Sequence, residues 1–242
     1  MINVVIPMAG AGSRFQKEGY TVPKPFILIN DKMMIEHVLD GVNVFNAHYT
    51  LVIQRKFLFE QKKELEFLIE KYKVGLVVVD SLTQGACCTA LATHEIINNN
   101  NPVVFVDSDN IFDNKQFNSF INEALEEKLD GSLLTFTTSD DCYSFVRIDQ
   151  AGYVIETKEK VAISNQAIAG AYFFSRGSTF VKYAIENIIY GNKTNNEFYM
   201  SNVFNYVVNA GLKIGTYNIS ANDWNCVGTP AQLKCYVNNL SK

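Results

Sequence analysis

A glycine-rich segment near the start of the chain carries the residues best suited to chemistry. A strand-like apolar run at 4–8 leads directly into Gly10, Gly12 and Arg14, and Lys24 follows between two prolines. Glycines let backbone N–H groups approach phosphate oxygens, and the two basic side chains add positive charge. A glycine-rich loop alone is a weak signal, but this loop with both a following Ser-Arg and a Pro-Lys-Pro is a strong one. The segment therefore indicates a site that holds the phosphates of a nucleoside triphosphate.

A second candidate group is acidic. Asp107, Ser108 and Asp109 directly follow an apolar run that starts at Pro102. Polar residues that end a strand in an ordinary turn would look similar. Mg²⁺, however, prefers carboxylate oxygens and phosphate oxygens as its ligands. We expect Asp109 to be the main Mg²⁺ ligand and Asp107 to be its partner.

With these residues in place, the chain resembles the nucleotidyltransferases that activate sugar 1-phosphates and related phosphorylated small molecules. Their opening motif is a strand, Gly-x-Gly-x-Arg and Pro-Lys-Pro, which Gly10–Arg14 and Pro23–Pro25 match. The likeness extends from Val4 to Pro230. It returns in six further blocks: Gln84–Ala86, Asp107–Asn110, Glu156–Lys158, Ala169–Tyr172, Glu197 and Gly228–Pro230.

The resemblance implies a role for each block. Arg14 and Lys24 would hold the triphosphate and stabilise the charge that builds on the departing pyrophosphate. Lys158, also counted as catalytic, would bind the acceptor phosphate, Glu197 would contact the acceptor's polar groups, and Gly170 would let the acceptor approach the backbone. The nucleotide would be bound by Ala9, Gly10, Ala11, Gly12, Ser13, Gln84, Gly85, Ala86 and Ser108.

Two of these roles have structural alternatives. Gln84 lies at a strand-to-helix turn, where its amide could read the edge of the base or simply cap the helix. Lys158 lies in a charged run, and such runs usually face solvent. The histidines cluster with no motif, and the adjacent Cys87 and Cys88 have the character of small buried thiols, so we assign these residues no chemistry.

The chain departs from the family pattern at Cys226. Many relatives carry an Asp at this place, two residues before a Gly, as a second metal ligand. A thiolate is soft and Mg²⁺ is hard, so Cys226 is a poor substitute. The metal shell is then completed by Asp223, Asn225, Asp107 or water, or the metal is held chiefly by Asp109 and the phosphates.

Composition sets the outer limits. The 242 residues are 48% apolar and 19% charged, with a net charge of −4, which fits one domain with a substantial core. We expect a nucleotide-binding half at about 1–115 and an acceptor-binding half at about 130–230 within the single domain 1–242. An acidic balance argues against nucleic acid as a partner. No run is apolar and long enough to span a bilayer and no secretory signal is visible, so we expect a cytoplasmic location and no membrane partner.

Apolar strands alternate with helical segments along the chain. The pattern predicts strands at 2–8, 49–54, 75–79, 102–107, 132–137, 167–175 and 213–218, a hairpin at 144–149 and 153–157, and helices at 34–44, 57–73, 86–97, 116–128, 178–190, 200–210 and 231–239. This order predicts an α/β fold with a Rossmann-like, mostly parallel central sheet flanked by helices. Ligands bind such sheets beyond the carboxyl ends of the strands. The glycine-rich loop and the acidic group should therefore meet at one edge.

These observations predict a Mg²⁺-dependent nucleotidyltransferase of GT-A-like fold, in which a small late β-rich portion covers the acceptor. It would join a nucleoside triphosphate to a sugar 1-phosphate or similar phosphorylated small molecule and release pyrophosphate. The resemblance also implies the supply of precursors for a capsule or another surface polysaccharide. We expect a pyrimidine base; the acceptor and the oligomeric state stay open.

Three alternatives remain. The enzyme could be a CTP-dependent cytidylyltransferase acting on a non-sugar phosphate of the phosphocholine type. It could be a GT-A glycosyltransferase that uses a nucleotide sugar, since Asp107-Ser108-Asp109 has the Asp-x-Asp form, although such an enzyme does not need Gly10–Arg14 and Lys24. It could also be a non-catalytic nucleotide-binding protein, a reading that only Cys226 favours.

Overall fold

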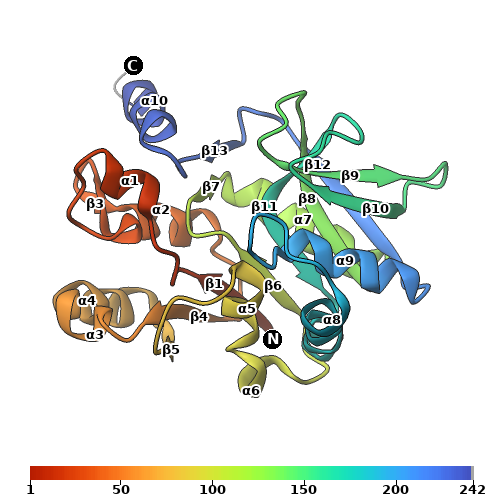
Figure 1. The fold of residues 1–242 in the computed structure, drawn as a ribbon, viewed down its shortest axis with the longest axis horizontal. Coiled ribbons are helices and arrows are strands. Elements are labelled where there is room, and N and C mark those ends of the chain that lie inside the picture. The colour runs from red at the N-terminus through yellow and green to blue at the C-terminus, as the bar shows by residue number, and fades with distance from the viewer. Residues whose placement is uncertain (241–242) are drawn as a thin grey trace.

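A nine-stranded sheet forms the centre of the part of the chain that the computed structural model describes, residues 1–240 (Figure 1). Its strands are β1 (Ile2–Pro7), β4 (Ala47–Gln54), β5 (Gly75–Val79), β6 (Val103–Val106), β8 (Gly131–Thr137), β9 (Ser144–Ile148), β10 (Val154–Glu159), β11 (Gln166–Phe174) and β12 (Ile214–Ile219). They run in the order β10-β9-β11-β6-β1-β4-β5, with β8 paired to β11 and to β12. The predicted α/β fold with a mostly parallel central sheet is confirmed.

The first half of the sheet is parallel. Strand β1 pairs in parallel with β4 on one side and with β6 on the other, and β5 continues the parallel order beyond β4. The β1 residues Val4, Val5 and Ile6 are fully buried because helices cover both faces of the sheet. Parallel strands end at the same edge, so the segments after β1 and β6 leave the sheet side by side.

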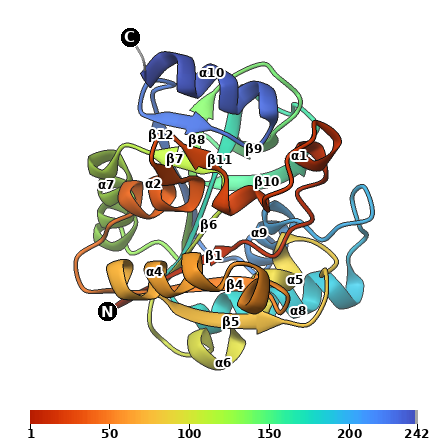
Figure 2. The same cartoon turned by 90° about the vertical axis from the view of Figure 1, so that its left-hand side faces the viewer.

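Helices cover the two faces of the sheet (Figures 1 and 2). One face packs against α2 (Met34–Gly41), α3 (Phe57–Glu60), α4 (Lys62–Tyr72), α7 (Asn114–Glu126) and α10 (Pro230–Leu240). The other face packs against α5 (Ala86–Leu91), α6 (His94–Ile97), α8 (Gly177–Tyr190) and α9 (Met200–Asn209). Successive β1 residues divide between these two cores, as the alternation of a strand requires.

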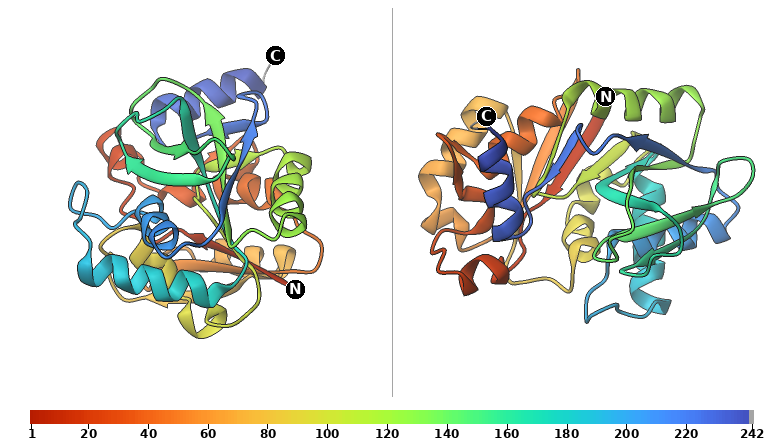
Figure 3. Two further views of the ribbon diagram at one scale, coloured as in Figure 1. Left: turned by 90° about the vertical axis from the view of Figure 1, so that its right-hand side faces the viewer. Right: turned by 90° about the horizontal axis from the view of Figure 1, so that it is seen from above.

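The later strands are mainly antiparallel. Strand β11 runs antiparallel to β6, β8 and β9, and β9 forms the predicted hairpin with β10. Figure 3 shows this hairpin and α9 on the opposite side of the molecule from α3 and α4. The closing helix α10 nevertheless returns to the early segments, where Lys234 lies 3.4 Å from the Glu18 carboxylate. The last helix in the chain thus packs on the first half of the molecule.

Small elements that the sequence did not predict surround the strand ends. They are α1 (Ser13–Lys17), the 3₁₀ turn η1 (Lys24–Phe26), β2 (Leu28–Ile29), β3 (Lys32–Met33), β7 (Asn110–Phe112) and β13 (Trp224–Cys226). The β7–β13 pair matters most, because it brings residue 226 opposite Asn110. The Trp224 indole donates a hydrogen bond to the Asn110 side-chain oxygen at 3.1 Å and closes the pair.

Two helices that we predicted as continuous are broken. The segment 57–73 divides into α3 and α4 at Gln61, whose φ of −127° is not helical. The segment 86–97 divides into α5 and α6, where the buried Thr93 hydroxyl donates to the Ala90 carbonyl at 2.7 Å. A β-branched residue that bonds the preceding turn in this way weakens a helix locally.

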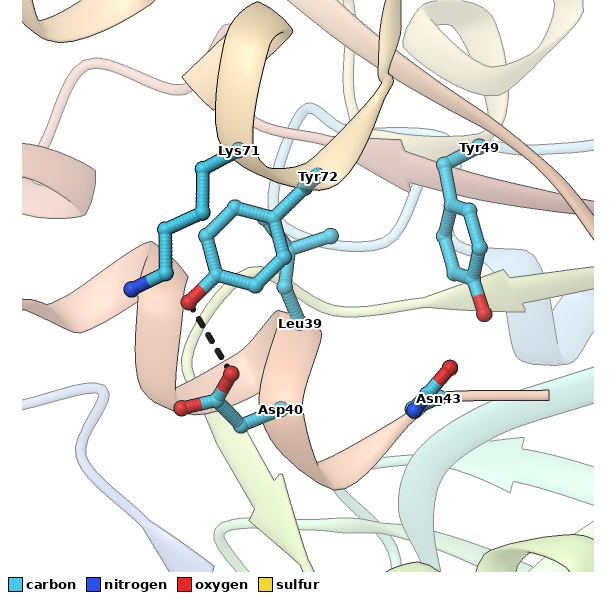
Figure 4. A pocket seen from close by; sticks show the side chains of 6 residues that line it. All are labelled: Leu39, Asp40, Asn43, Tyr49, Lys71 and Tyr72. Carbon is cyan, nitrogen blue, oxygen red and sulfur yellow. Dashed lines mark hydrogen bonds between the residues drawn. The ribbon is translucent and has the colours of Figure 1, made fainter. Parts of the chain in front are cut away.

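A small hollow of about 290 Å³ lies at the amino end of β4, between the carboxyl ends of α2 and α4 (Figure 4). The Tyr72 hydroxyl donates to Asp40 at 2.9 Å, and Lys71 pairs at 2.9 Å with the buried Glu36. These bonds tie α4 to α2. The hollow is at the sheet edge opposite to the carboxyl ends of the strands. Among residues 1–240, no helix is both long enough and apolar enough to cross a membrane.

Candidate active site

A cavity of about 300 Å³ opens at the carboxyl ends of β1 and β6. The predicted site residues that line it are Ala9, Gly10, Ala11, Gly12, Arg14, Lys24, Gly85, Ala86, Asp107, Ser108, Asp109 and Glu197. These residues come from five separate stretches of sequence. The cavity is therefore the place where the topology assembles the predicted chemistry.

The glycine-rich loop is held by a residue that the motifs did not indicate. Buried Gln54, the last residue of β4, donates from its side-chain nitrogen to the Ala9 carbonyl at 2.7 Å. The same nitrogen lies 3.4 Å from the Gly10 carbonyl, and the Met8 amide donates to the Val52 carbonyl at 2.9 Å. With its carbonyls anchored to β4, the loop is fixed next to the cavity. Ser13 begins α1 between the lining residues Gly12 and Arg14 and does not itself line the cavity.

Lys24 and Asp109 meet across the cavity. Their charged atoms lie 2.6 Å apart, and each side chain is less than one-fifth exposed. Asp107 belongs to the same group: burial and the nearby Asp109 raise the pKa of Asp107 above its usual range, and Lys24 opposes the shift. One cation thus faces two acidic side chains, and this arrangement can accept an additional positive charge.

The two carboxylates fit a Mg²⁺ ion that is also bound by phosphate oxygens, rather than one that protein ligands surround completely. A Cβ atom at position 228 would lie only 2.6 Å from a carboxylate oxygen of Asp109. Because residue 228 is glycine, there is room beside that oxygen. Asp107 lines the same cavity. Within residues 1–240 no cluster of three or more His, Cys, Asp or Glu residues could hold a metal alone. Two carboxylates that share the ion with phosphate oxygens are a common Mg²⁺ arrangement.

Cys226 lies beside these carboxylates but differs from them chemically. Burial, and then the charge of Asp109, raises the pKa of the Cys226 thiol to about 12. The thiol is therefore neutral at physiological pH and adds no negative charge. Asn225 is opposite Ile111 in the β7–β13 pair and so alternates to the other face from Cys226. Among the expected replacements on the chain, Asp107 is the one that lines the cavity.

The loop at 84–86 packs against Phe198, a residue from the later half of the chain. Gly85 has φ +119°, and a Cβ atom there would lie 2.6 Å from the Phe198 carbonyl oxygen, so only glycine fits. The Phe198 amide donates to the Gln84 carbonyl at 2.7 Å, and the Cys87 amide donates to the Phe198 carbonyl at 3.1 Å. The Gln84 side chain is exposed and does not line the cavity. Gln84 therefore contacts the rest of the molecule through its backbone carbonyl and not through its side-chain amide.

Gly170 is not among the residues that line the cavity. Its φ is +80°, and a Cβ atom would lie 2.1 Å from the Asn110 amide nitrogen and 2.7 Å from an Asp107 carboxylate oxygen. Its carbonyl accepts from the Asp107 amide at 2.9 Å. Gly170 therefore makes room for Asn110 and Asp107 behind the cavity and does not line it.

Lys158 is likewise outside this cavity. Its side chain is half exposed and lines a separate groove, and its ammonium group lies 3.6 Å from the Glu156 carboxylate. The next lysine, Lys160, lies closer to the site: its ammonium donates to the hydroxyl of Tyr199, a lining residue, at 3.3 Å. The sequence predicts that the charged run with Lys158 and Lys160 faces solvent, and the family resemblance alone favours Lys158 within it.

A buried carboxylate that the sequence did not single out adjoins Lys160. Glu159 accepts hydrogen bonds from the hydroxyls of Ser144 and Ser201, the latter at 3.0 Å. Burial raises its pKa, and the two serine hydroxyls oppose the shift. Strand alternation places Glu159 on the buried side with Thr157 and leaves Lys158 exposed, so a strict period of two could have found it.

This architecture, with a mostly parallel sheet and a loop-built cavity at the strand carboxyl ends, has the nucleotidyltransferase fold. The nucleoside-diphosphate-sugar pyrophosphorylase of Vibrio cholerae RC9 superposes with a TM-score of 0.83 at 21% identity, covering 97% of this chain and 99% of that one. A UDP-glucose pyrophosphorylase complexed with UDP-glucose gives a TM-score of 0.81 at 17% identity, covering 100% and 99%.

The family follows from the sequence itself. The nucleotidyl transferase family model matches residues 3–241, and the chain belongs to that family. This confirms the family resemblance and the enzyme class. The bifunctional protein GlmU of Thermodesulfovibrio yellowstonii (strain ATCC 51303 / DSM 11347 / YP87) is 24% identical over 241 residues, which are 96% of this chain. The chain spans about half the length of that curated relative, 50%.

Proposed function

We propose that the chain transfers a nucleotidyl group from a nucleoside triphosphate to a phosphorylated small molecule, a sugar 1-phosphate being the favoured acceptor. The observation that carries this proposal is the Lys24–Asp109 pair at 2.6 Å within the cavity that the glycine-rich loop lines. This site offers donors for phosphates and carboxylates for a divalent cation, and the proposed reaction needs no enzyme nucleophile. Such a set suits phosphoryl chemistry, in which positioning and charge stabilisation supply most of the catalysis.

The residues have distinct tasks in this reaction. Backbone N–H groups of the loop, with Arg14 and Lys24, bind the triphosphate and stabilise charge on the leaving pyrophosphate. Asp109 and Asp107 would hold Mg²⁺, which when bound neutralises phosphate charge. An acceptor phosphate oxygen attacks the α-phosphorus, the bond from that phosphorus to the bridging oxygen breaks, and pyrophosphate leaves. The neutral Cys226 thiol adds no competing charge.

The acceptor is expected on the Glu197 side of the cavity, where Tyr199 and Tyr172 also line it. Lys160 and Glu159 lie next to this side through Tyr199 and Ser201. We include Lys160 as a candidate for the acceptor phosphate besides Lys158, because Lys160 reaches a lining residue. Glu197, Gly170 and the remaining nucleotide-binding assignments stay in the proposal as expected from the sequence.

A pyrimidine nucleotide is the favoured donor. The end of the cavity beside α5 is lined by Leu82, Thr83, Gly85 and Ala86. The whole cavity, about 300 Å³, is at the small end of the range for small-molecule sites, which favours a one-ring base. The supply of precursors for a surface polysaccharide, in the cytoplasm, is the proposed setting of this reaction.

Pyrophosphate release tests the proposal. Each nucleoside triphosphate is combined with Mg²⁺ and a panel of sugar 1-phosphates and non-sugar phosphomonoesters, including phosphocholine. We expect release with one donor–acceptor pair, lost in Asp109→Asn and kept in Asp141→Asn, a matched change at an exposed loop residue. A non-sugar acceptor with CTP would replace the sugar assignment. Nucleotide binding without release from any pair would reject catalysis.

A further inference from the structure

A groove larger than the active-site cavity lies between β10 and the helices α8 and α9. It encloses about 830 Å³, within the range of small-molecule binding sites. Figure 1 shows α9 running beside β10. The reaction above uses this groove only through Lys158, a candidate for the acceptor phosphate, which lies with Glu159 on its β10 wall.

One face of α9 supplies a stripe of polar side chains to the groove. Asn202, Asn205, Tyr206 and Asn209 all line it. They follow the spacing i, i+3, i+4 and i+7, which places them on a single face of the helix. The opposite face carries the buried residues Val203, Phe204 and Val207, which anchor α9 in the core. The polar stripe is therefore held rigidly toward β10.

The stripe has unused hydrogen-bonding capacity. Asn205 is occupied, since its amide bridges the edge of β10 by accepting from the Thr157 amide at 2.8 Å and donating to the Thr157 carbonyl at 3.0 Å. The side chains of Asn202, Tyr206 and Asn209 have no hydrogen bond to another group within residues 1–240. Asn202 and Tyr206 are partly buried, and their polar side-chain atoms stay accessible to water or to a ligand that replaces it.

The charges along the groove cancel. Arg147 and Lys158 both pair with Glu156. The remaining carboxylate, Glu159, takes hydrogen bonds from two serine hydroxyls. Two cations against two carboxylates leave no net charge to attract an ion. Ile155 and Val161, each about half exposed, add apolar contact surface.

We propose that this groove binds a neutral, hydroxyl-rich ligand, namely a segment of a saccharide chain. A primary amide and a phenol each donate and accept, and so does every sugar hydroxyl, so the two sets match. The apolar wall suits the C–H faces of a sugar ring. The site is separate from the nucleotidyl transfer proposed above and does not depend on it.

Nuclear magnetic resonance titration of the full chain tests this assignment. The probes are maltose and maltohexaose, with uridine and inorganic phosphate as comparison compounds. We expect the side-chain amide signals of Asn202 and Asn209 to shift with the saccharides, and more strongly with the longer one. The double variant Asn202→Leu with Asn209→Leu should weaken saccharide binding about tenfold or more. Asn122→Leu, a matched change at an exposed position of α7, should leave binding unchanged.

The outcomes separate the alternatives. Saccharide shifts confined to the active-site cavity, or none at millimolar concentration, would overturn the proposal even if the double variant failed to fold, because the unmodified chain gives this result. Stronger shifts with uridine or phosphate would assign the groove to another ligand class. Pyrophosphate release measured on the same double variant should stay at the unmodified level, so failure of the reaction proposal and failure of the groove proposal remain distinguishable.

Discussion

The Lys24–Asp109 pair determines the chemistry of the site at the scale of single residues. Removing either charge takes away one of the fixed charges that are aimed at the phosphates and the metal. We expect Lys24→Met and Asp109→Asn each to lower the rate of pyrophosphate release by about 10²–10³-fold. Because the two side chains touch, the double variant should lose less than the product of the two single losses.

Steady-state rates of the two single variants and the double variant check this cycle. Lys17→Met, a matched change at an exposed lysine of α1, should leave the rate unchanged. Strictly multiplicative losses would contradict a functional link between Lys24 and Asp109.

Glu159 should leave a signature in the pH dependence of stability. Its pKa is raised in the folded state, mainly by burial, so the folded protein holds this proton more tightly than the unfolded chain does. The contribution to stability is therefore present below the unfolded carboxyl pKa of about 4.3 and is lost as pH rises through the raised value. Relative to Glu159→Gln, the unmodified chain should lose stability across that interval.

Urea midpoints of both proteins from about pH 4 to pH 8 measure the effect. Curves that run parallel at all pH values would mean that Glu159 does not titrate with a raised pKa. Ser201→Ala, which removes one hydroxyl that stabilises the carboxylate, should enlarge the pH dependence.

Sequence motifs predicted the residues whose roles depend on the backbone of the loop and on their fixed spacing. They did not predict side chains whose direction depends on the local geometry of the chain. The glycine-rich loop, Lys24 and Asp109 were predicted to meet, and they do. Lys158 lies within β10, whereas Lys160 follows the end of the strand with a left-handed φ of +54°, a local turn that the charged run does not reveal. Gln54 was missed because a single buried amide at a strand end has no motif.

At the scale of elements, the loop at 84–86 approaches Phe198 so closely that only glycine fits at position 85. Gly85→Ala combines a left-handed φ with a Cβ atom 2.6 Å from a backbone oxygen. We expect a loss of at least about 3 kcal/mol in the free energy of unfolding. Gly152→Ala is the matched control, because it has φ +87° in open space and should cost about 1 kcal/mol.

Chemical denaturation of the two variants decides between strain and crowding. Equal losses would show that the Phe198 contact adds nothing to the conformational penalty. A larger loss for Gly85→Ala, together with weaker nucleotide binding, is the expected result.

The long elements of the fold follow from apolar periodicity, and the short ones do not. Strands such as β5 and β11, and helices such as α8 and α9, lie within a few residues of their predicted ranges. The β7–β13 pair is only three residues long on each side, too short for an alternation to be recognised, and its partners are more than one hundred residues apart. The breaks at Gln61 and Thr93 depend on local torsions and one hydroxyl, which a 3.6-residue period does not register.

At the scale of the whole molecule, substrate binding should appear as stabilisation. A nucleoside triphosphate with Mg²⁺ at a hundred times its Kd adds about 2.7 kcal/mol, which for a chain of this size raises Tm by about 5–10 °C. Lys24→Met should remove most of that shift while its Tm without nucleotide stays measurable. Thermal scans with and without nucleotide provide the test, and equal shifts in both proteins would place the triphosphate elsewhere.

Because Lys24 and Asp109 already form an ion pair, substrate binding must replace that pair with new partners for both charges. Before substrate arrives, each charge already has a partner, so an incoming anion must draw Lys24 away and leave Asp109 in need of a new counter-ion. A cation that enters with the nucleotide restores neutrality, whereas either species alone leaves a charge stranded in a largely desolvated place. Nucleotide and metal should consequently each tighten the binding of the other by the same factor, as the reciprocity of linked equilibria requires.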